Sequence, residues 1–202
     1  MAGTQRLLAI ALAFSLAGIP RSAKPEALGI VVQADHASLG SEPASEGTTV
    51  YDGDRLSTEA RGSLRLLIGK AMLYVTEQSS VIVRQDANIA AKEFEAELVS
   101  GTAVLSVTAG ATGEIVASSA RIRPMAETRG VVQVRLVGTH ELVVFAQRGP
   151  AQISYHGESE TLAEGKSYRV LLNSSDDSAS ERRARKNRES TARRSCSSRL
   201  AR

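Results

Sequence analysis

A two-residue alternation of apolar and polar side chains runs through most of this 202-residue sequence. It is clear over residues 63–68, 94–98 and 131–137, and each such run is followed by a glycine-containing turn. Because successive side chains of a strand point to opposite faces of a sheet, this period predicts strands with one buried face. Turn signals at intervals of about 8–12 residues predict an all-β fold of short antiparallel strands, in a β-solenoid-like or sandwich-like arrangement.

The strands that this pattern predicts cover most of residues 28–172, which we take as one β domain. One segment, Asn88–Leu98, has a competing helical pattern, but Glu95 and Glu97 alternate with apolar residues, which favours a strand after Lys92. The expected strands are Gly29–Gln33, Arg55–Thr58, Ser63–Ile68, Met72–Thr76, Val81–Arg84, Phe94–Val99, Ala103–Thr108, Glu114–Ala117, Ala120–Arg123, Val131–Val137, Glu141–Gln147, Ala151–Tyr155, Glu160–Leu162 and Tyr168–Leu172.

A weak internal repeat, glycine-x-alanine-x-aliphatic, begins at Gly69, Gly101 and Gly149. Each copy is expected to end one strand and begin the next, with the glycine turning the chain where a positive φ or a close backbone approach is needed. The spacings of the copies are unequal, and ordinary glycine turns before small residues explain the pattern equally well.

The net charge of +3 and the pI of about 9.2 would suggest a basic protein, but the charge is unevenly distributed. Residues 24–173 contain 14 Lys and Arg against 18 Asp and Glu, whereas residues 174–202 contain nine against four. The domain is therefore mildly acidic and the tail basic, and the two are interpreted separately.

The N-terminus has the pattern of a secretory signal peptide. Arg6 precedes the apolar run Leu7–Ile19, which at about 1.5 Å per residue is too short to cross a hydrocarbon core of about 30 Å. We expect residues 1–23 to be a signal peptide cleaved near residue 17 or 23, and the mature protein to be exported to the periplasm or cell envelope of a bacterium without a transmembrane span.

Residues 174–202 are rich in Ser and Arg and contain Leu200 as their one large aliphatic residue. Such a segment cannot bury a core, so we expect a disordered basic tail. It is either a solubilising tail or a weak binder of polyanions such as anionic lipids or envelope glycans. The candidate polyanion contacts are Arg182, Arg183, Arg185, Lys186, Arg188, Arg193 and Arg194.

Several segments, in order, resemble the FecR-like domains. The opening motif matches at residues 47–58, the next hairpin at residues 62–81, a central glycine turn at residues 97–103, and the closing strands at residues 143–149 and 162–166. The resemblance covers Leu28 to Leu172. The motif residues that lie at turns are Gly47, Gly53, Asp54, Thr58, Gly69, Gly101, Gly149 and Gly165.

The resemblance implies an all-β, solenoid-like periplasmic domain used for binding. Signalling members of the family hold a sigma factor through a cytoplasmic segment, but here only six residues precede the apolar run. The Thr-Pro and Gly-Thr-x-Phe elements of the second half of the family domain are also missing. We therefore expect no direct binding of a sigma factor.

No catalytic or metal-binding pattern stands out. His36, His140 and His156 have no His or Cys at ligand spacing and are expected in surface turns. Asp52-Gly53-Asp54 is expected to form a hydrogen-bonded turn rather than a calcium site, since no further acidic ligands follow in phase. The single cysteine, Cys196, excludes an intramolecular disulfide and a cysteine-based zinc cluster.

The sequence thus predicts an exported, non-catalytic FecR-like domain that needs no cofactor or metal. It is expected to bind a protein or glycan in the cell envelope, in signalling or envelope assembly, and its folded part is not expected to bind nucleic acid. Two alternatives remain open. One is a glycan-active envelope enzyme on a β-solenoid, which needs a cleft with two facing carboxyl groups. The other is a polyanion binder that acts through the basic tail.

Overall fold

The structure is a computed structural model, and it describes residues 27–85, 94–125 and 129–172. All regular elements in this part of the chain are β-strands, so the predicted all-β fold is confirmed. The strands are β1 (Ala27–Leu39), β2 (Glu42–Pro43), β3 (Thr49–Tyr51), β4 (Arg55–Ile68), β5 (Ala71–Val75), β6 (Ser80–Gln85), β7 (Phe94–Thr108), β8 (Glu114–Ala117), β9 (Ala120–Pro124), β10 (Arg129–Val137), β11 (Glu141–Arg148), β12 (Ala151–Tyr155), β13 (Glu158–Leu162) and β14 (Ser167–Leu171).

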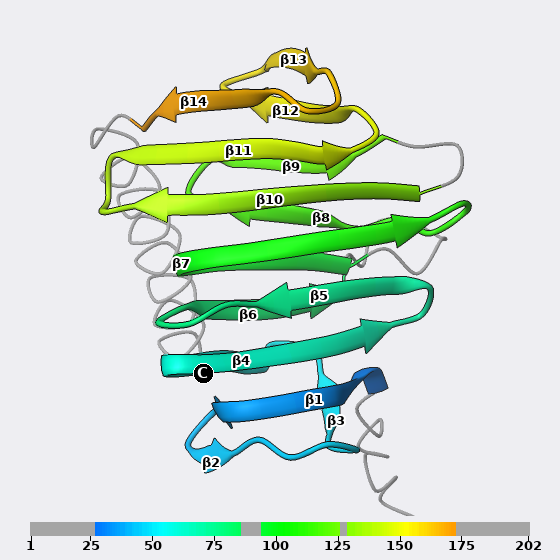
Figure 1. Cartoon of the computed structure of the whole chain (residues 1–202), viewed down its shortest axis with the longest axis vertical. Coiled ribbons are helices and arrows are strands. Elements are labelled where there is room, and N and C mark those ends of the chain that lie inside the picture. Colours follow the sequence, from blue (N-terminus) through cyan, green and yellow to red (C-terminus); the bar gives the residue numbers. More distant parts are fainter. Residues whose placement is uncertain (1–26, 86–93, 126–128, 173–202) are drawn as a thin grey trace, which may run out of the picture.

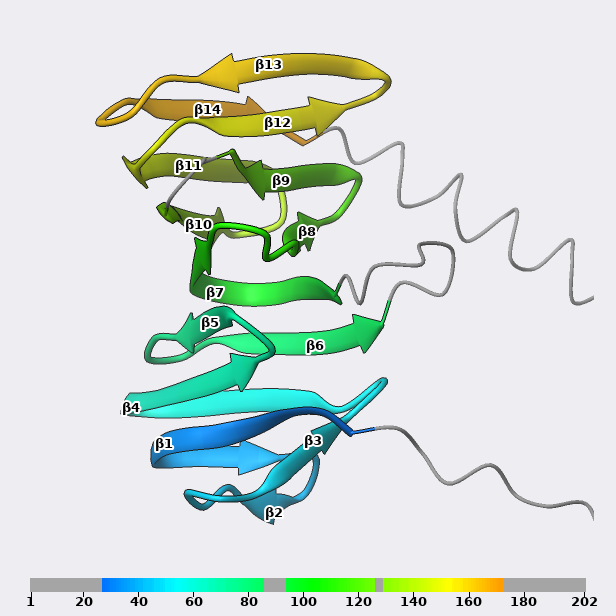
Figure 2. The same ribbon diagram turned by 90° about the vertical axis from the view of Figure 1, so that its right-hand side faces the viewer.

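The strands are stacked in two layers, from β2 and β3 at one end to β13 and β14 at the other (Figures 1 and 2). In one layer the hydrogen-bonded order is β1, β4, β5, β7, β10, β11 and β14. In the second layer it is β2, β1, β4, β6, β7, β8, β9, β12 and β13. Among the described pairs, β7 with β8 is the one parallel pairing, and the predicted antiparallel arrangement holds elsewhere.

Three strands are longer than predicted because they bend and continue from one layer into the other. β1, β4 and β7 have 13, 14 and 15 residues, and the bends contain His36, Arg61 and Gly101, all with positive φ. The pairs of runs predicted at 55–58 with 63–68 and at 94–99 with 103–108 are therefore single bent strands. Since β4 and β7 each pair with both β5 and β6, these four strands form a closed ring.

The core lies between the layers and consists of the apolar members of the alternating pattern. Leu64 and Leu66 of β4 are fully buried, as are Val132 and Val134 of β10. The strand that was predicted after Lys92 is β7, which begins at Phe94. β2 and β3 were not predicted, because two or three residues are too few to show a period.

Buried hydroxyl groups tie the bends of β4 and β7 to the turn between β5 and β6. The hydroxyl oxygen of Thr58 donates to the carbonyl oxygen of Thr76 and accepts from the amide of Ser79 at 3.1 Å. The Ser79 hydroxyl oxygen accepts from the amide of Thr102 at 2.8 Å. Beside it, Gly101 has a φ of 81°, and a Cβ there would lie 2.7 Å from the carbonyl oxygen of Gln78. The bend of β7 thus requires glycine.

Candidate functional site

The two ends of the stack are built differently, and the end formed by β2 and β3 is closed. Val50 of β3, which pairs with β1, is fully buried. Two carboxylates fix the following turn: Asp54 accepts from the amide of Tyr51, and Asp52 accepts from the amide of Gln85, both at 2.8 Å. The hydrogen-bonded turn predicted for Asp52-Gly53-Asp54 is therefore confirmed.

At the opposite end, each layer finishes in a strand that has one unpaired edge within the described residues. Among the described strands, β13 pairs with β12 alone and β14 pairs with β11 alone. A two-residue turn with positive φ at His156 and Gly157 folds β13 back along β12. Apart from the turn of residues 163–166 that joins β13 to β14, no described element lies across the gap between these strands, so this end of the stack is open within the described part of the chain.

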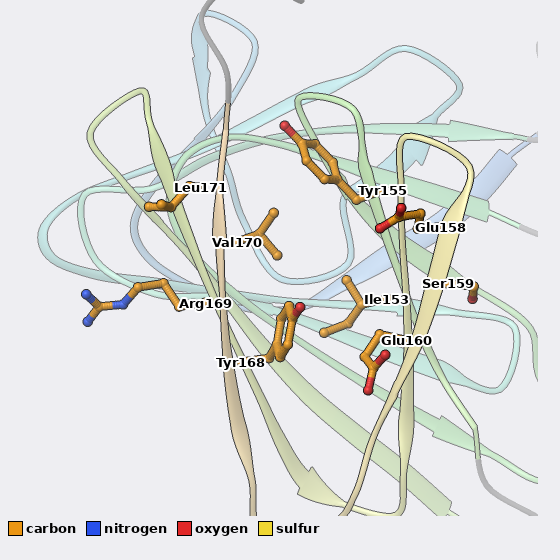
Figure 3. A pocket seen from close by; sticks show the side chains of 9 residues that line it. All are labelled: Ile153, Tyr155, Glu158, Ser159, Glu160, Tyr168, Arg169, Val170 and Leu171. Carbon is orange, nitrogen blue, oxygen red and sulfur yellow. The ribbon is translucent and has the colours of Figure 1, made fainter.

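A cavity of about 690 Å³ lies at this open end, between the β12–β13 hairpin and β14 (Figure 3). Its walls combine apolar, aromatic and charged side chains. The lining residues are Ile153, Tyr155, Glu158, Ser159, Glu160, Tyr168, Arg169, Val170 and Leu171.

The strand register determines which of these side chains point between the layers. Glu158 and Glu160 are in register with Tyr155 and Ile153, and Ile153 is almost fully buried, so both carboxylates lie on the inner face of β13. On the other wall, Tyr168 is in register with the buried Val144. The cavity therefore has carboxylates on one wall and a tyrosine on the other.

The charged side chains of the cavity differ in whether they have an ion-pair partner among the described residues. Arg169 lies on the outer side of β14 and forms an ion pair of 3.1 Å with Glu141. Glu158 and Glu160 are exposed and make no hydrogen bond or ion pair within the described residues. Two apolar surfaces are also exposed here, since Tyr168 is 43% and Leu171 68% accessible. Within the described residues, this end therefore presents negative charge without a partner beside exposed apolar surface.

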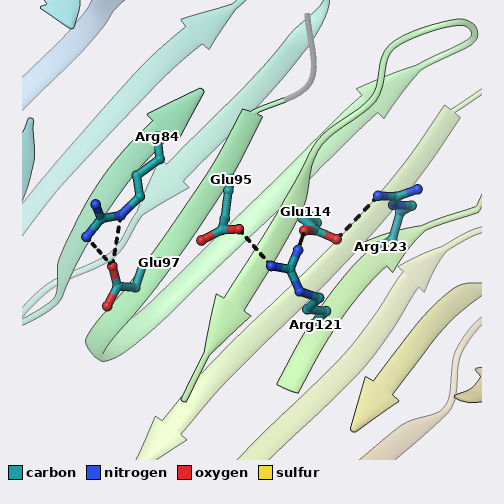
Figure 4. Close-up of polar contacts among 6 residues, drawn as sticks. All are labelled: Arg84, Glu95, Glu97, Glu114, Arg121 and Arg123. Atoms are coloured by element: carbon teal, nitrogen blue, oxygen red, sulfur yellow. Dashed lines mark hydrogen bonds and ion pairs between the residues drawn. The ribbon is translucent and has the colours of Figure 1, made fainter. Parts of the chain in front are cut away.

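A second polar cluster lies on the outer face of the layer that contains β8 and β9 (Figure 4). Glu114, of which 9% of the side chain is exposed, pairs with both Arg121 and Arg123. Arg121 also contacts Glu95 at 3.2 Å. These pairs connect β7, β8 and β9 across the sheet, and with its carboxylate held by two guanidinium groups the cluster is suited to stabilising the sheet.

The residues matched to the FecR-like motif lie at turns and bends throughout the stack and are not brought together at one site. Gly101 was expected between two strands but lies inside β7, where it bends the strand. Asp54 and Thr58 make the hydrogen bonds described above. The glycine φ angles are 86° at Gly47, 85° at Gly53, 56° at Gly69, 81° at Gly101, 68° at Gly149 and 74° at Gly165.

The histidines are exposed; His140 and His156 lie in turns as predicted, whereas His36 lies inside β1. His36 accompanies the bend of β1 and contacts Asp35 at 2.9 Å, His140 lies between β10 and β11, and His156 lies in the β12–β13 turn. Among residues 27–85, 94–125 and 129–172, no group of three His, Cys, Asp or Glu is placed to hold a metal ion.

Three predictions concern residues outside the described part of the chain: the signal peptide at residues 1–23, the disordered tail with its candidate polyanion contacts, and the free Cys196. In the part of the chain that is described, no helix is long and apolar enough to cross a bilayer.

Sequence analysis did not identify the cavity residues, although one signal was present. In the segment Glu158–Leu162 the period-two pattern places Glu158 and Glu160 on the same face as the apolar Leu162. Charges on the core face of a strand are unusual, and they mark a strand whose inner face is not covered along its whole length.

No protein-family profile matches the sequence, and no curated protein matches it either. Two crystal structures, at 1.65 and 2.50 Å resolution, share a distant structural similarity with it; both are of a candidate anti-sigma factor from Parabacteroides distasonis ATCC 8503. Each has a TM-score of 0.44 and 10% sequence identity, and each match covers 59% of this chain and 60% of the other. The match thus spans less than two thirds of either protein.

Proposed function

We propose that this chain is an exported, non-catalytic binding domain of the bacterial cell envelope and that its partner docks at the open end of the stack. The observation that carries the proposal is the cavity of about 690 Å³ between β13 and β14. It combines a concave, partly apolar surface with a few charged groups, which is the usual composition of a binding site. The pattern of residues 1–23 supports export.

The assignment to the FecR-like domains is part of this proposal. It is supported by the order of the matching segments between Leu28 and Leu172. A role in signalling or envelope assembly follows from that resemblance, and direct binding of a sigma factor is not proposed. The chain is proposed to act without a cofactor, by binding alone.

The geometry of the cavity favours binding over glycan hydrolysis. Glycosidases place two carboxyl groups on either side of the bond that breaks. Here Glu158 and Glu160 lie on one strand and on the same face, and the opposite wall carries Tyr168 and Val170. The two carboxylates are therefore arranged to contact one side of a bound molecule.

Site-specific photocrosslinking in intact bacteria tests the docking site. A photoreactive phenylalanine analogue replaces Tyr168 at the open end or, as a matched control, Tyr51 at the closed end, where 38% of the tyrosine is accessible. We expect a discrete adduct in the envelope fraction from position 168 and none from position 51. Equal adducts at both positions, or a chain that stays in the cytosol with residues 1–23 intact, would contradict the proposal.

A further inference from the structure

The free edge of β14 has the hydrogen-bonding pattern of a strand that can accept a neighbour. In an antiparallel pair, alternate residues direct both backbone groups toward the same partner strand. The amide of Leu172 donates to the carbonyl of His140, and the amide of Ala146 donates to that of Lys166. It follows from this alternation that residues 168 and 170 pair with β11, whereas residues 167, 169 and 171 direct their amide and carbonyl groups to the free edge.

A strand added at this edge would place its side chains in two environments. Residues that follow the register of Tyr168 and Val170 would point into the cavity. Residues in the register of Arg169 and Leu171 would point to the outer surface. β14 has five residues, so an added strand of similar length presents two side chains to the cavity.

The chemistry of the cavity determines which side chains suit those two positions. Each would extend past Ile153, Val170 and the ring of Tyr168 toward Glu158 and Glu160, which have no partner within the described residues. Lys and Arg combine a long apolar stem with a cationic end, and the cation is attracted to both carboxylates and tyrosine rings. Acidic side chains would be repelled.

We propose that the partner contributes an extended, basic segment that adds to β14 as an antiparallel strand, with Lys or Arg at two alternate positions facing Glu158 and Glu160. This inference rests on the proposed function and specifies how the open end is used. We infer an antiparallel orientation for the added strand because every described pair of neighbouring strands from β4 to β14 in the layer that ends at β14 is antiparallel. Main-chain hydrogen bonds supply affinity and the alternate side chains supply specificity.

The inward carboxylates of Glu158 and Glu160 could serve a second role, and the test must distinguish this role from partner binding. Charges on the inner side of an edge strand also prevent unwanted pairing between molecules. If that is their sole role, replacing Glu158 and Glu160 with Gln makes the protein self-associate, and peptide binding does not depend on them.

The test measures binding of a labelled, end-capped seven-residue peptide that alternates Thr and Lys to the full chain, by fluorescence anisotropy. The control peptide has Glu in place of Lys. We expect the Lys peptide to bind saturably and the Glu peptide not to bind. In the double variant Glu158→Gln, Glu160→Gln the affinity for the Lys peptide should fall about tenfold, which is the effect expected when two exposed charge contacts are lost. The matched double variant Glu42→Gln, Glu46→Gln changes the same charge at the closed end and is expected to bind normally.

Backbone pairing is tested with two N-methylated forms of the Lys peptide. In the proposed arrangement the Thr amides face β14 and the Lys amides face away, so methylation of the Thr amides abolishes binding and methylation of the Lys amides does not. Equal effects of the two peptides, or binding that the Glu158 and Glu160 substitutions leave unchanged, would overturn the inference.

A chain ending at residue 173 serves as a further control, because the tail carries Lys186 and Arg188 in the same alternate spacing. Tighter peptide binding after truncation shows that the tail competes for the same edge, and unchanged binding shows that it does not. Either result supports strand addition, provided that the Gln substitutions at Glu158 and Glu160 weaken peptide binding. Binding of soluble envelope glycans in place of the Lys peptide overturns the inference. A crosslink at Tyr168 without peptide selectivity would leave the proposed function standing.

Discussion

Replacing Thr58 with Val should destabilise the domain, because it removes a hydroxyl group that joins the bent strand β4 to the turn between β5 and β6. Valine keeps the shape of the side chain, so little cavity forms and the change isolates the hydrogen bonds. The Thr58 hydroxyl accepts from the Ser79 amide at 3.1 Å and donates to the Thr76 carbonyl. Thr58 and Ser79 are 7% and 2% exposed, so water cannot easily replace the lost acceptor.

A buried donor left without an acceptor costs about 1–3 kcal/mol, and the Thr76 carbonyl, which is half-buried, adds less. We therefore expect the free energy of unfolding to fall by about 2 kcal/mol. For a domain of this size that corresponds to a fall in Tm of about 5 °C. The m-value should not change, since the same surface is exposed on unfolding.

Urea unfolding followed by circular dichroism measures this difference. Thr161→Val is the matched control, because Thr161 is exposed on β13 and its hydroxyl makes no hydrogen bond within the described residues. It should change the free energy of unfolding by less than about 0.5 kcal/mol. If Thr58→Val is no more destabilising than the control, the hydroxyl groups do not hold the bends together and the reasoning is refuted.

Two further substitutions test other parts of the framework by the same unfolding measurement. Gly101→Ala should cost at least about 2 kcal/mol, because its φ of 81° is strained for alanine and the new Cβ would approach a carbonyl oxygen; Gly138→Ala, at a φ of 61° in open space, should cost about 1 kcal/mol. Similar costs at both glycines would show that close approach does not matter at the bend. Glu114→Gln should cost about 1–2 kcal/mol because its carboxylate is nearly buried between two arginines, whereas Glu97→Gln, which breaks an exposed pair, should cost less than about 0.5 kcal/mol. An equal loss at Glu97 would argue against burial as the cause.

The alternation of side chains was enough to predict most of the strands and the buried positions of the alternating runs. Glu114–Ala117 and Ala151–Tyr155 were predicted with the observed bounds, and the apolar positions of the alternating runs are buried. The period cannot distinguish two strands from one strand that bends, because both give the same pattern on either side of a turn. Arg61 shows the difficulty, since a non-glycine residue holds a positive φ inside β4 and nothing in its type predicts that.

The cavity could not have been located from the sequence, because its position depends on which strand comes last in each layer. Tyr168 and Glu158 are 10 residues apart in the chain and lie in different layers, and the pairing of β14 with β11 brings them to the same end. The inward glutamates were the local sign of an uncovered face, but alternation alone did not show what lies opposite.

The strands that pass from one layer to the other give the domain an uneven stiffness. In the first half, β1, β4 and β7 belong to both layers, so separating the layers there would require breaking continuous strands. Beyond β7 each described strand belongs to a single layer, and the layers are held together by side-chain packing and connecting turns. Local opening of the domain should therefore start beyond β7, where the layers can part without breaking a continuous strand.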